Sequence, residues 1–219
     1  MNELVIFDVD GTILKGQSQK LFLNYMFKEK YISLFGFIKL NLWFIFYKLD
    51  FIKNPLPAIN YAYSFLKGKS ISEIENLINN FFNSILKKYI FKEVIEIIND
   101  HLKNGRKVIL VSNSVDILIK KIAEYLNVSD FISTKLEVQN DRYTGKIIGS
   151  MMYGENKIKA VEQYAQKNNI SLNNSWSYAD HYSDIPLLLK TTYVFVVNPS
   201  KKLQQIATEK NWQVLQFNI

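Results

Sequence analysis

Short apolar runs bounded by turn residues recur along the chain, and stretches with helical spacing separate most of them. The runs are rich in β-branched and aromatic residues, which is typical of buried strands. They lie at Leu4–Phe7, Lys107–Val111, Ser175–Ala179 and Tyr193–Val197. The helical stretches lie at Val115–Leu126, Lys157–Lys167 and Lys201–Lys210. Strands that alternate with helices predict an α/β fold with a Rossmann-like, mostly parallel sheet covered on both faces.

Weaker patterns fill the rest of the second half. Residues 131–148 look extended, with a turn at Asn140-Asp141. A short helix is expected near Ile185–Leu189, and a last strand at Trp212–Phe217. Together with the first strand, these elements assign residues 1–15 and 91–219 to one α/β catalytic core.

Residues 16–90 interrupt this alternation, because they look helical and are unusually aromatic. We expect them to form a helical cap domain inserted after the first strand. The segment 31–52 is its most apolar part, with only Lys39, Lys48 and Asp50 charged, and its uncharged runs are too short to span a bilayer. A helix that is apolar nearly all round must be buried, either in the cap, against a second copy in a homodimer, or in the surface of a membrane.

The composition limits which catalytic and metal-binding groups the chain can use. The chain has no cysteine, which excludes disulfides, thiolate nucleophiles and cysteine-ligated metal sites. Only two histidines are present, His101 and His181, so oxygen ligands and a hard cation such as Mg²⁺ are favoured. The lack of cysteine fits a reducing compartment, and the N-terminus carries no signal-peptide pattern. We therefore expect a cytoplasmic protein, with the inner face of the membrane as the alternative location.

The net charge of +7 is spread over short basic pairs such as Lys87-Lys88, Lys120-Lys121 and Lys201-Lys202. Such pairs are typical of a solvated surface, and attraction to phosphate-bearing partners or anionic lipid is the alternative interpretation. No motif combines basic and aromatic residues in the way of a nucleic-acid reader, so we expect no nucleic-acid partner.

Two pairs of aspartates follow predicted strands. Asp8 and Asp10 come after the first apolar run and precede Gly11, while Asp180 and Asp184 come after the run that begins at residue 175. Ligands of open α/β sheets bind at the carboxyl ends of strands. A turn or a helix cap would explain one aspartate of a pair. Two carboxylates at each strand end indicate a site that holds a cation and acts on an anion.

A serine and a lysine stand near the starts of two other predicted helices. Ser112 follows a core strand, and a hydroxyl with backbone N–H groups at a helix N-terminus binds a phosphoryl group well. Plain N-capping by Ser112 or Ser114 is an equally good interpretation. Lys157 opens its helix and can reach toward a phosphate, although lysines there usually face solvent. Lys159 is the rival candidate.

The order of these features resembles the haloacid dehalogenase-like (HAD) phosphohydrolases. The segment Phe7-Asp8-Val9-Asp10-Gly11-Thr12 is similar to their nucleophile motif, and a serine, a lysine and a second acidic pair follow in the same order as in that superfamily. The insert directly after the first motif looks like the helical cap of the subgroup that includes the phosphoserine phosphatases (subfamily IB). The resemblance covers nearly the whole chain outside the cap.

The resemblance implies a Mg²⁺-dependent phosphatase that forms an aspartyl-phosphate intermediate. Asp8 would be the nucleophile, and Asp10 would act as general acid and then as general base. The Asp8 carboxylate, the Asp10 backbone carbonyl and the Asp180 carboxylate would hold the metal. Asp184 would bind the metal through water or orient Lys157, whose charge would offset that of Asp8 and the phosphate.

Other residues would bind the substrate. Ser112 and the backbone near Asn113 would bind phosphoryl oxygens, and Gly11, Thr12 and Gln17 complete the expected set. Three of these positions depart from the phosphoserine phosphatases: Gln17 stands in place of a glutamate, Gly11 in place of a serine and Asn113 in place of a glycine. The departures argue against phosphoserine and leave a small phosphorylated molecule of unknown identity as the expected substrate.

Two other functions stay open. One is a lipid-phosphate phosphatase that docks its apolar cap on a membrane, because a bacterial phosphatidylglycerophosphate phosphatase family has a similar layout. The other is a catalytically weak, phosphate-binding regulatory protein, although the aspartates that such a protein would lose are all present.

Overall fold

The computed structural model describes residues 3–48 and 56–218. The chain forms two compact units. The first comprises Met1–Ser18, Leu86–Thr134 and Ser150–Ile219, and the second comprises Gln19–Ile85 and Lys135–Gly149. The sequence assigned the insert to residues 16–90 and left 135–149 with the α/β core, whereas in the structure residues 135–149 group with the inserted helices. No described helix combines the length and the apolar character that crossing a bilayer requires.

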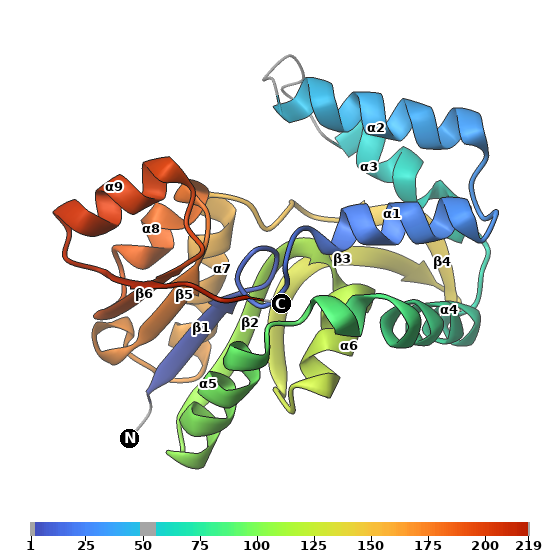
Figure 1. Cartoon of the computed structure of the whole chain (residues 1–219). Coiled ribbons are helices and arrows are strands. Elements are labelled where there is room, and N and C mark those ends of the chain that lie inside the picture. Colours follow the sequence, from blue (N-terminus) through green and yellow to red (C-terminus); the bar gives the residue numbers. More distant parts are fainter. Residues whose placement is uncertain (1–2, 49–55, 219) are drawn as a thin grey trace. The chain divides into compact units, whose positions relative to one another are not determined.

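The first unit is built on a parallel sheet (Figure 1). Its strands pair in the order β3-β2-β1-β5-β6-β7, and every neighbouring pair is parallel. The strands are β1 (Leu4–Asp8), β2 (Lys107–Val115), β3 (Asp130–Gln139, which continues into the second unit), β5 (Trp176–Ala179), β6 (Tyr193–Val197) and β7 (Gln213–Leu215). Central β1 is buried along its whole length, as its continuous apolar run predicts. The predicted Rossmann-like α/β class is confirmed.

Helices cover both faces of this sheet. On one face, α7 (Glu155–Lys167) and α8 (Ile185–Leu188) pack on apolar residues of β1 and β2 such as Ile6, and α9 (Lys201–Glu209) packs on β6. The next residue of β1, Phe7, points to the opposite face and meets His101 of α5 (Lys92–Lys103). A further helix, α6 (Asp116–Tyr125), also contacts β2.

Three aromatic rings stack across the sheet beside α5. The ring centroids of Phe7 and Tyr178 lie 4.2 Å apart, and those of Tyr178 and Phe195 lie 4.6 Å apart. The rings meet because the strand register pairs the same residues. Stacked pairs contribute about 0.5–1.5 kcal/mol each beyond the area they bury. The ladder fixes β1 against β5, and therefore fixes the loops that follow these two strands.

β2 is longer than the sequence predicted. It continues through Ser112 and Ser114 to Val115, and its pairing with β3 shifts between Val111 and Val115. The helix α6 begins only at residue 116, and its cap residue, Val115, makes no side-chain cap bond. The helix predicted at Val115–Leu126 agrees with α6 to within one residue at each end, but the capping interpretation was wrong, because the N-cap of α6 is Val115 and neither serine caps it.

The second unit contains helices and a hairpin. The helices are α1 (Ser18–Lys28, whose first residue belongs to the first unit), α2 (Leu34–Lys48), α3 (Leu56–Tyr63) and α4 (Ile71–Ser84). The ring of Phe81 from α4 lies 5.1 Å from Phe22 and 5.2 Å from Tyr25 of α1. Ser70 and Glu73 form a complete capping box at the start of α4.

The hairpin joins the end of β3 to β4 (Arg142–Ile148). Its turn residues Asn140 and Asp141 both have positive φ, as the sequence suggested for a tight turn. The backbone N–H of Tyr143 donates to the Lys69 carbonyl at 2.9 Å, and the N–H of Gly68 donates to the Tyr143 carbonyl at 2.8 Å. These bonds explain why the hairpin belongs to the second unit rather than to the parallel sheet.

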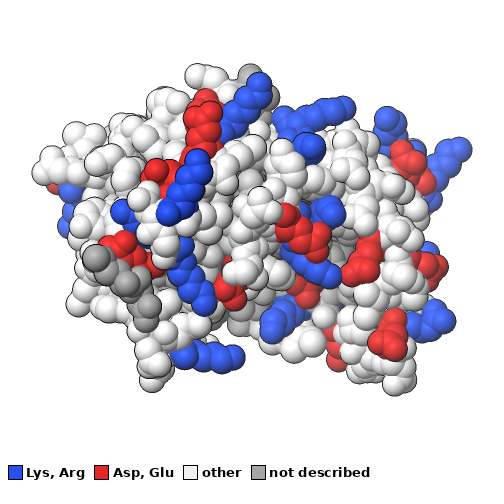
Figure 2. All heavy atoms as spheres, turned by 90° about the horizontal axis from the view of Figure 1, so that it is seen from below, with Lys and Arg blue, Asp and Glu red and all other residues white. Residues whose placement is uncertain are grey.

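Charge is mixed on the face of the molecule that Figure 2 shows. Lys and Arg side chains lie among Asp and Glu side chains there. The excess of positive charge is therefore not concentrated in one stripe on this face.

Candidate active site

The loop after β1 turns back sharply at Gly11. The carbonyl of Val9 accepts hydrogen bonds from the N–H groups of Ile13 and Leu14, each at 2.9 Å, and the N–H of Gly11 donates to the Leu14 carbonyl at 2.8 Å. Gly11 has a φ of +90°, and a Cβ there would stand 2.1 Å from Oδ2 of Asp180. Both the conformation and the space require glycine.

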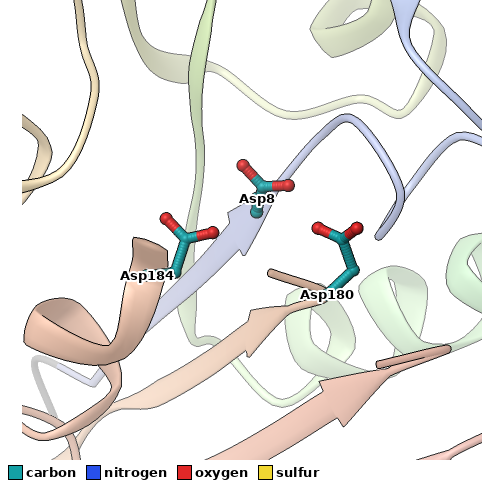
Figure 3. A group of neighbouring side chains, drawn as sticks. All are labelled: Asp8, Asp180 and Asp184. Carbon is teal, nitrogen blue, oxygen red and sulfur yellow. The ribbon is translucent and has the colours of Figure 1, made fainter. Parts of the chain in front are cut away.

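Three carboxylates converge at the carboxyl end of the sheet (Figure 3). Asp8 ends β1, Asp180 directly follows β5, and Asp184 ends a short 3₁₀ turn before α8. One oxygen of each lies within 4.8 Å of the others. Because β1 and β5 are parallel neighbours, the residues that follow them reach the same edge of the sheet.

Lys157 of α7 joins the carboxylates. Its Nζ donates to Oδ1 of Asp8 at 2.6 Å and to Oδ1 of Asp184 at 2.7 Å, and the residue is only 4% exposed. The next residue, Ile158, packs against the sheet and so helps to fix α7 beside the site. Lys159 is exposed and lies 3.6 Å from Glu155 instead. Of the two lysines that the sequence offered, the structure brings Lys157 to the acidic cluster.

The cluster carries more negative charge than one ammonium can balance. Burial raises the pKa of Asp8 to about 7; repulsion from Asp184 and Asp10 adds to the rise, and Lys157 opposes it. Burial, together with Asp8 and Asp184, raises the pKa of Asp180 to about 8. Burial disfavours the charged form of Lys157, but Asp184 and Asp8 outweigh it and hold the pKa above its ordinary value. A bound cation would offset the excess negative charge and lower the pKa values of these aspartates.

The donor set suits a hard divalent cation. The clustered ligand atoms are carboxylate oxygens, which Mg²⁺ prefers, and the chain supplies no cysteine. Burial and the neighbouring carboxylates raise the pKa values of Asp8 and Asp180, and a cation between them would favour their ionised forms. Asp8, Asp180 and Asp184 could therefore hold the ion that the sequence predicted.

The Asp10 side chain is held by two serines outside the three-carboxylate cluster. Its Oδ1 accepts a 2.7 Å bond from the backbone N–H of Ser18, and its Oδ2 accepts a 3.0 Å bond from the Ser114 hydroxyl. The hydroxyls of Ser18 and Ser114 lie 2.6 Å apart. Burial raises the pKa of Asp10, and the bonds from the two serines oppose the rise.

The predicted phosphoryl-binding residues lie in the same unit. Ser112 is buried, and its Oγ accepts a 3.1 Å bond from the N–H of Ser114. The Asn113 carbonyl accepts from the hydroxyl of Thr134 at 2.8 Å. Thr12 is fully buried, and its hydroxyl has no hydrogen-bond partner among the described residues. Gln17 is exposed just before α1.

Sequence reasoning missed the contribution of Ser18 and treated Ser114 only as a helix cap. A signal for Ser114 was present, since residues two apart on an extended strand point to the same face, which places Ser112 and Ser114 together. That signal required a strand through residue 115, whereas the pattern indicated that it ended at Val111. No local signal identified Ser18, because its partner Ser114 lies 96 positions away.

Comparison with known proteins agrees with this geometry. A family model described as haloacid dehalogenase-like hydrolase matches residues 5–189. The chain belongs to this family. The predicted superfamily and the assignment to the hydrolases are therefore confirmed, and the matched range includes every aspartate of the site.

Several relatives of this HAD protein have phosphatase names. It is 26% identical over 216 residues to a Mycobacterium tuberculosis protein named phosphoserine phosphatase, covering 97% of this chain and 70% of that protein. It is 25% identical over 225 residues to a histidinol-phosphatase of Neisseria meningitidis, covering 99% of this chain and all of the other.

Solved structures share the fold. A protein of unknown function from Bordetella pertussis superposes with a TM-score of 0.89 at 23% identity, covering 98% of this chain and 99% of the other. A substrate-bound phosphoserine phosphatase superposes with a TM-score of 0.68 at 18% identity, covering 98% and 93% of the two chains. At these identities the likeness concerns the fold alone.

Proposed function

We propose that this HAD protein is a Mg²⁺-dependent phosphomonoester hydrolase that forms an aspartyl-phosphate on Asp8. The observation that carries the proposal is the pair of contacts by which buried Lys157 joins Asp8 and Asp184 beside Asp180. A nucleophilic carboxylate, a fixed cation and further acidic ligands are what transfer of a phosphoryl group to an aspartate requires.

In the first step, a carboxylate oxygen of Asp8 attacks phosphorus, and the bond from phosphorus to the leaving oxygen breaks. Lys157 holds Oδ1 of Asp8, which favours Oδ2 as the attacking atom. Asp10 gives its proton to the leaving oxygen. The raised pKa of Asp10 supports this role, because the carboxyl group must carry a proton near neutral pH.

In the second step, Asp10 acts as a base. It takes a proton from a water molecule that attacks the phosphorus of the aspartyl-phosphate. The bond from phosphorus to Asp8 breaks, inorganic phosphate is released, and Asp10 regains its proton for the next cycle. Ser112, Thr12 and the backbone near Asn113 bind the phosphoryl oxygens in both steps.

Asp8, Asp180, Asp184 and the Asp10 carbonyl would hold the metal. Bound Mg²⁺ supplies charge neutralisation for the phosphoryl oxygens. Lys157 contributes a second, fixed positive charge, and its burial keeps that charge from being screened by water.

We propose a small-molecule phosphate as the substrate. The phosphatase names of the relatives support this class, and the departures at Gln17, Gly11 and Asn113 argue against phosphoserine itself. A screen in Mg²⁺ buffer should include sugar phosphates, histidinol phosphate, phosphoserine and a lysophospholipid phosphate.

Substitution of the nucleophile tests the function. Asp8→Asn keeps the shape but removes the attacking charge, so we expect turnover of the best substrate to fall at least about 10³-fold. The matched control is Asp141→Asn in the exposed hairpin turn, which should hydrolyse normally. Acid-quenched labelling should detect a phosphoenzyme in the unaltered chain and none in Asp8→Asn. Phosphate binding without turnover by the unaltered chain would instead favour a regulatory role.

A second candidate function rests on the exposed face of α2. The side chains of Leu34, Phe35, Ile38, Leu42 and Ile45 are 60%, 75%, 48%, 48% and 53% exposed. Phe35, Ile38, Leu42 and Ile45 recur every three or four residues, so they share one side of α2. The opposite side includes Leu40, which is 3% exposed, so α2 has both a buried and an exposed apolar side.

We propose that this exposed face, called the α2 apolar face below, contacts an anionic membrane and admits lipid phosphates. Residues 30–48 contain Lys30, Lys39 and Lys48 and no acidic residue. Two copies paired through the same face would bring these lysines together, whereas anionic lipid would attract them. Of the segment 31–52 named from the sequence, residues 49–52 lie outside the described part.

Vesicle flotation tests the membrane contact. The chain should float with vesicles of anionic lipid and remain at the bottom with neutral ones. The double variant Phe35→Glu and Ile38→Glu should not float, whereas Leu189→Glu, at an exposed leucine outside α2, should float normally. Failure to float, with full activity on soluble phosphates, would exclude the lipid proposal. A dimer in sedimentation that the double variant abolishes would assign the α2 apolar face to self-association.

A further inference from the structure

Both carboxylate oxygens of Asp10 accept hydrogen bonds from groups in distant parts of the chain. The N–H that reaches Oδ1 comes from Ser18, the first residue of α1, and the hydroxyl that reaches Oδ2 comes from Ser114, near the end of β2. Ser18 and Ser114 are both fully buried. A carboxylate that accepts one bond at each oxygen cannot rotate about its terminal torsion without breaking one of them.

The direction of the hydrogen bonds follows from counting protons. A serine hydroxyl has one proton to donate. When Asp10 is ionised, Ser114 donates its proton to Asp10, and the 2.6 Å contact between the two hydroxyls is then donated by Ser18. The hydroxyl of Ser18 thus orients that of Ser114, which orients Asp10. Each oxygen of Asp10 keeps a second lone pair, so these bonds leave a position for proton exchange.

Ser114 also connects Asp10 to the predicted phosphoryl-binding serine. Its backbone N–H donates to Oγ of Ser112 at 3.1 Å. The irregular stretch of β2, where pairing with β3 shifts, makes both bonds possible because residues 112–114 leave the regular ladder. Ser114 therefore contacts both the expected general acid and the expected phosphoryl-binding serine.

We propose that Ser114, supported by the Ser18 hydroxyl, is a positioning residue that aims the Asp10 carboxyl group at the leaving oxygen of the substrate. This inference rests on the proposed function. Misplacement of a catalytic group by about 1 Å can cost on the order of 10²-fold in rate. The cost should depend on the leaving group, since an acidic leaving group departs without needing the proton from Asp10.

The test is the leaving-group dependence of kcat/KM, which reports the first step. The substrates are 4-nitrophenyl, phenyl and ethyl phosphate, in order of increasingly basic leaving groups. In Ser114→Ala we expect kcat/KM for ethyl phosphate to fall roughly 10- to 100-fold, and for 4-nitrophenyl phosphate only slightly. Ser18→Ala keeps the backbone N–H to Asp10 and should show the same trend with a smaller loss. Ser114→Thr retains a hydroxyl and should restore much of the activity.

The control is Ser177→Ala, which removes another fully buried serine hydroxyl, one that lies 2.5 Å from the hydroxyl of Thr191 in the loop before β6. Its kcat/KM values should follow those of the unaltered chain for all three substrates. An equal loss for all three in Ser114→Ala would overturn the positioning role while leaving the hydrolase proposal intact. If Ser114→Ala does not fold, Ser18→Ala decides by the same criterion. No hydrolysis by the unaltered chain would overturn the proposed function and this inference together.

Discussion

The Cα of Gly11 lies so close to the Asp180 carboxylate that a Cβ there would stand 2.1 Å from Oδ2. This relationship joins the loop after β1 to the residue after β5, two segments that lie far apart in sequence. It explains why the residue after Asp10 has no side chain: a larger one would displace a carboxylate of the acidic cluster.

Gly11→Ala should therefore lose both stability and Mg²⁺ binding. We expect a loss of about 1–3 kcal/mol from backbone strain and the forced shift of Asp180, measured by urea unfolding. The matched control is Gly16→Ala, because Gly16 has the same φ of +90° but nothing within 4 Å of an added Cβ. Gly16→Ala should lose stability through strain alone and bind Mg²⁺ normally in calorimetry. Equal Mg²⁺ affinity in both variants would contradict the steric explanation.

Lys157→Met should destabilise the protein and abolish most hydrolysis. The change leaves the buried Asp8 and Asp184 without their 2.6 Å and 2.7 Å partner, and breaking a buried ion pair in this way costs about 3–5 kcal/mol. Lys159→Met, two residues along the same helix, removes an exposed lysine and should leave the unfolding midpoint unchanged. Similar midpoints for the two variants would show that the contacts of Lys157 contribute little.

The metal-free protein should lose stability as pH rises. The pKa values of Asp8 and Asp180 are raised by folding from 3.8 to about 7 and about 8, so the folded state binds more protons than the unfolded state between these values. The contribution of these two carboxyl groups to stability is full below their ordinary pKa and is lost as pH rises through the folded pKa values.

Mg²⁺ should reverse this loss, because it binds the ionised carboxylates in place of protons. We expect the gain in melting temperature on adding Mg²⁺ to be larger at pH 8 than at pH 5.5. Asp180→Asn should show a smaller gain and a flatter pH profile without metal. A gain that is the same at both pH values would argue against metal binding at these carboxylates.

In the folded state, His101 should stay neutral at pH values well below its ordinary pKa. Burial, and then the neighbouring Arg106, lower its pKa to about 4. Arg106 can only donate, so Nδ1 of His101 accepts its 3.2 Å bond and Nε2 carries the proton, which it donates to the Tyr178 hydroxyl at 2.9 Å.

The consequence is a loss of stability in acid. As pH falls, His101 takes up a proton in the unfolded state before it does so in the folded state. The contribution of neutral His101 to folding stability is therefore full above pH 6.5 and is lost as pH falls toward 4. Nitrogen NMR should detect the Nε2–H tautomer and no protonation of His101 between pH 7 and pH 5.5. An imidazolium signal at pH 6 would contradict the assignment. His101→Gln should remove this part of the pH dependence.

Much of the parallel core could be predicted because its signals are local. The apolar run before Asp8 predicted β1, which is buried along its whole length, and the five-residue run at Tyr193–Val197 predicted β6 with the same bounds. The Asn140-Asp141 turn was equally visible, because those residues tolerate positive φ. The extension of β2 through Ser114 was not, since polar residues at a strand end look like the start of a helix.

The hairpin at residues 135–149 illustrates the same limit. Its extended pattern and its turn could be read locally, but nothing in the pattern says which unit it joins. That depends on backbone hydrogen bonds such as the one from Tyr143 to Lys69, and backbone groups carry no sequence identity.

By itself, the sequence determined which chemistry this protein has available: aspartates after two core strands, a lysine opening a helix, no thiols and few imidazoles. Only the tertiary structure decided between Lys157 and Lys159 and joined Ser18 and Ser114 to Asp10. Composition and periodicity act over a few residues, whereas the contacts of a buried charge depend on which distant segments pack around it. Whether such a side chain faces solvent or a carboxylate therefore depends on its neighbours in space.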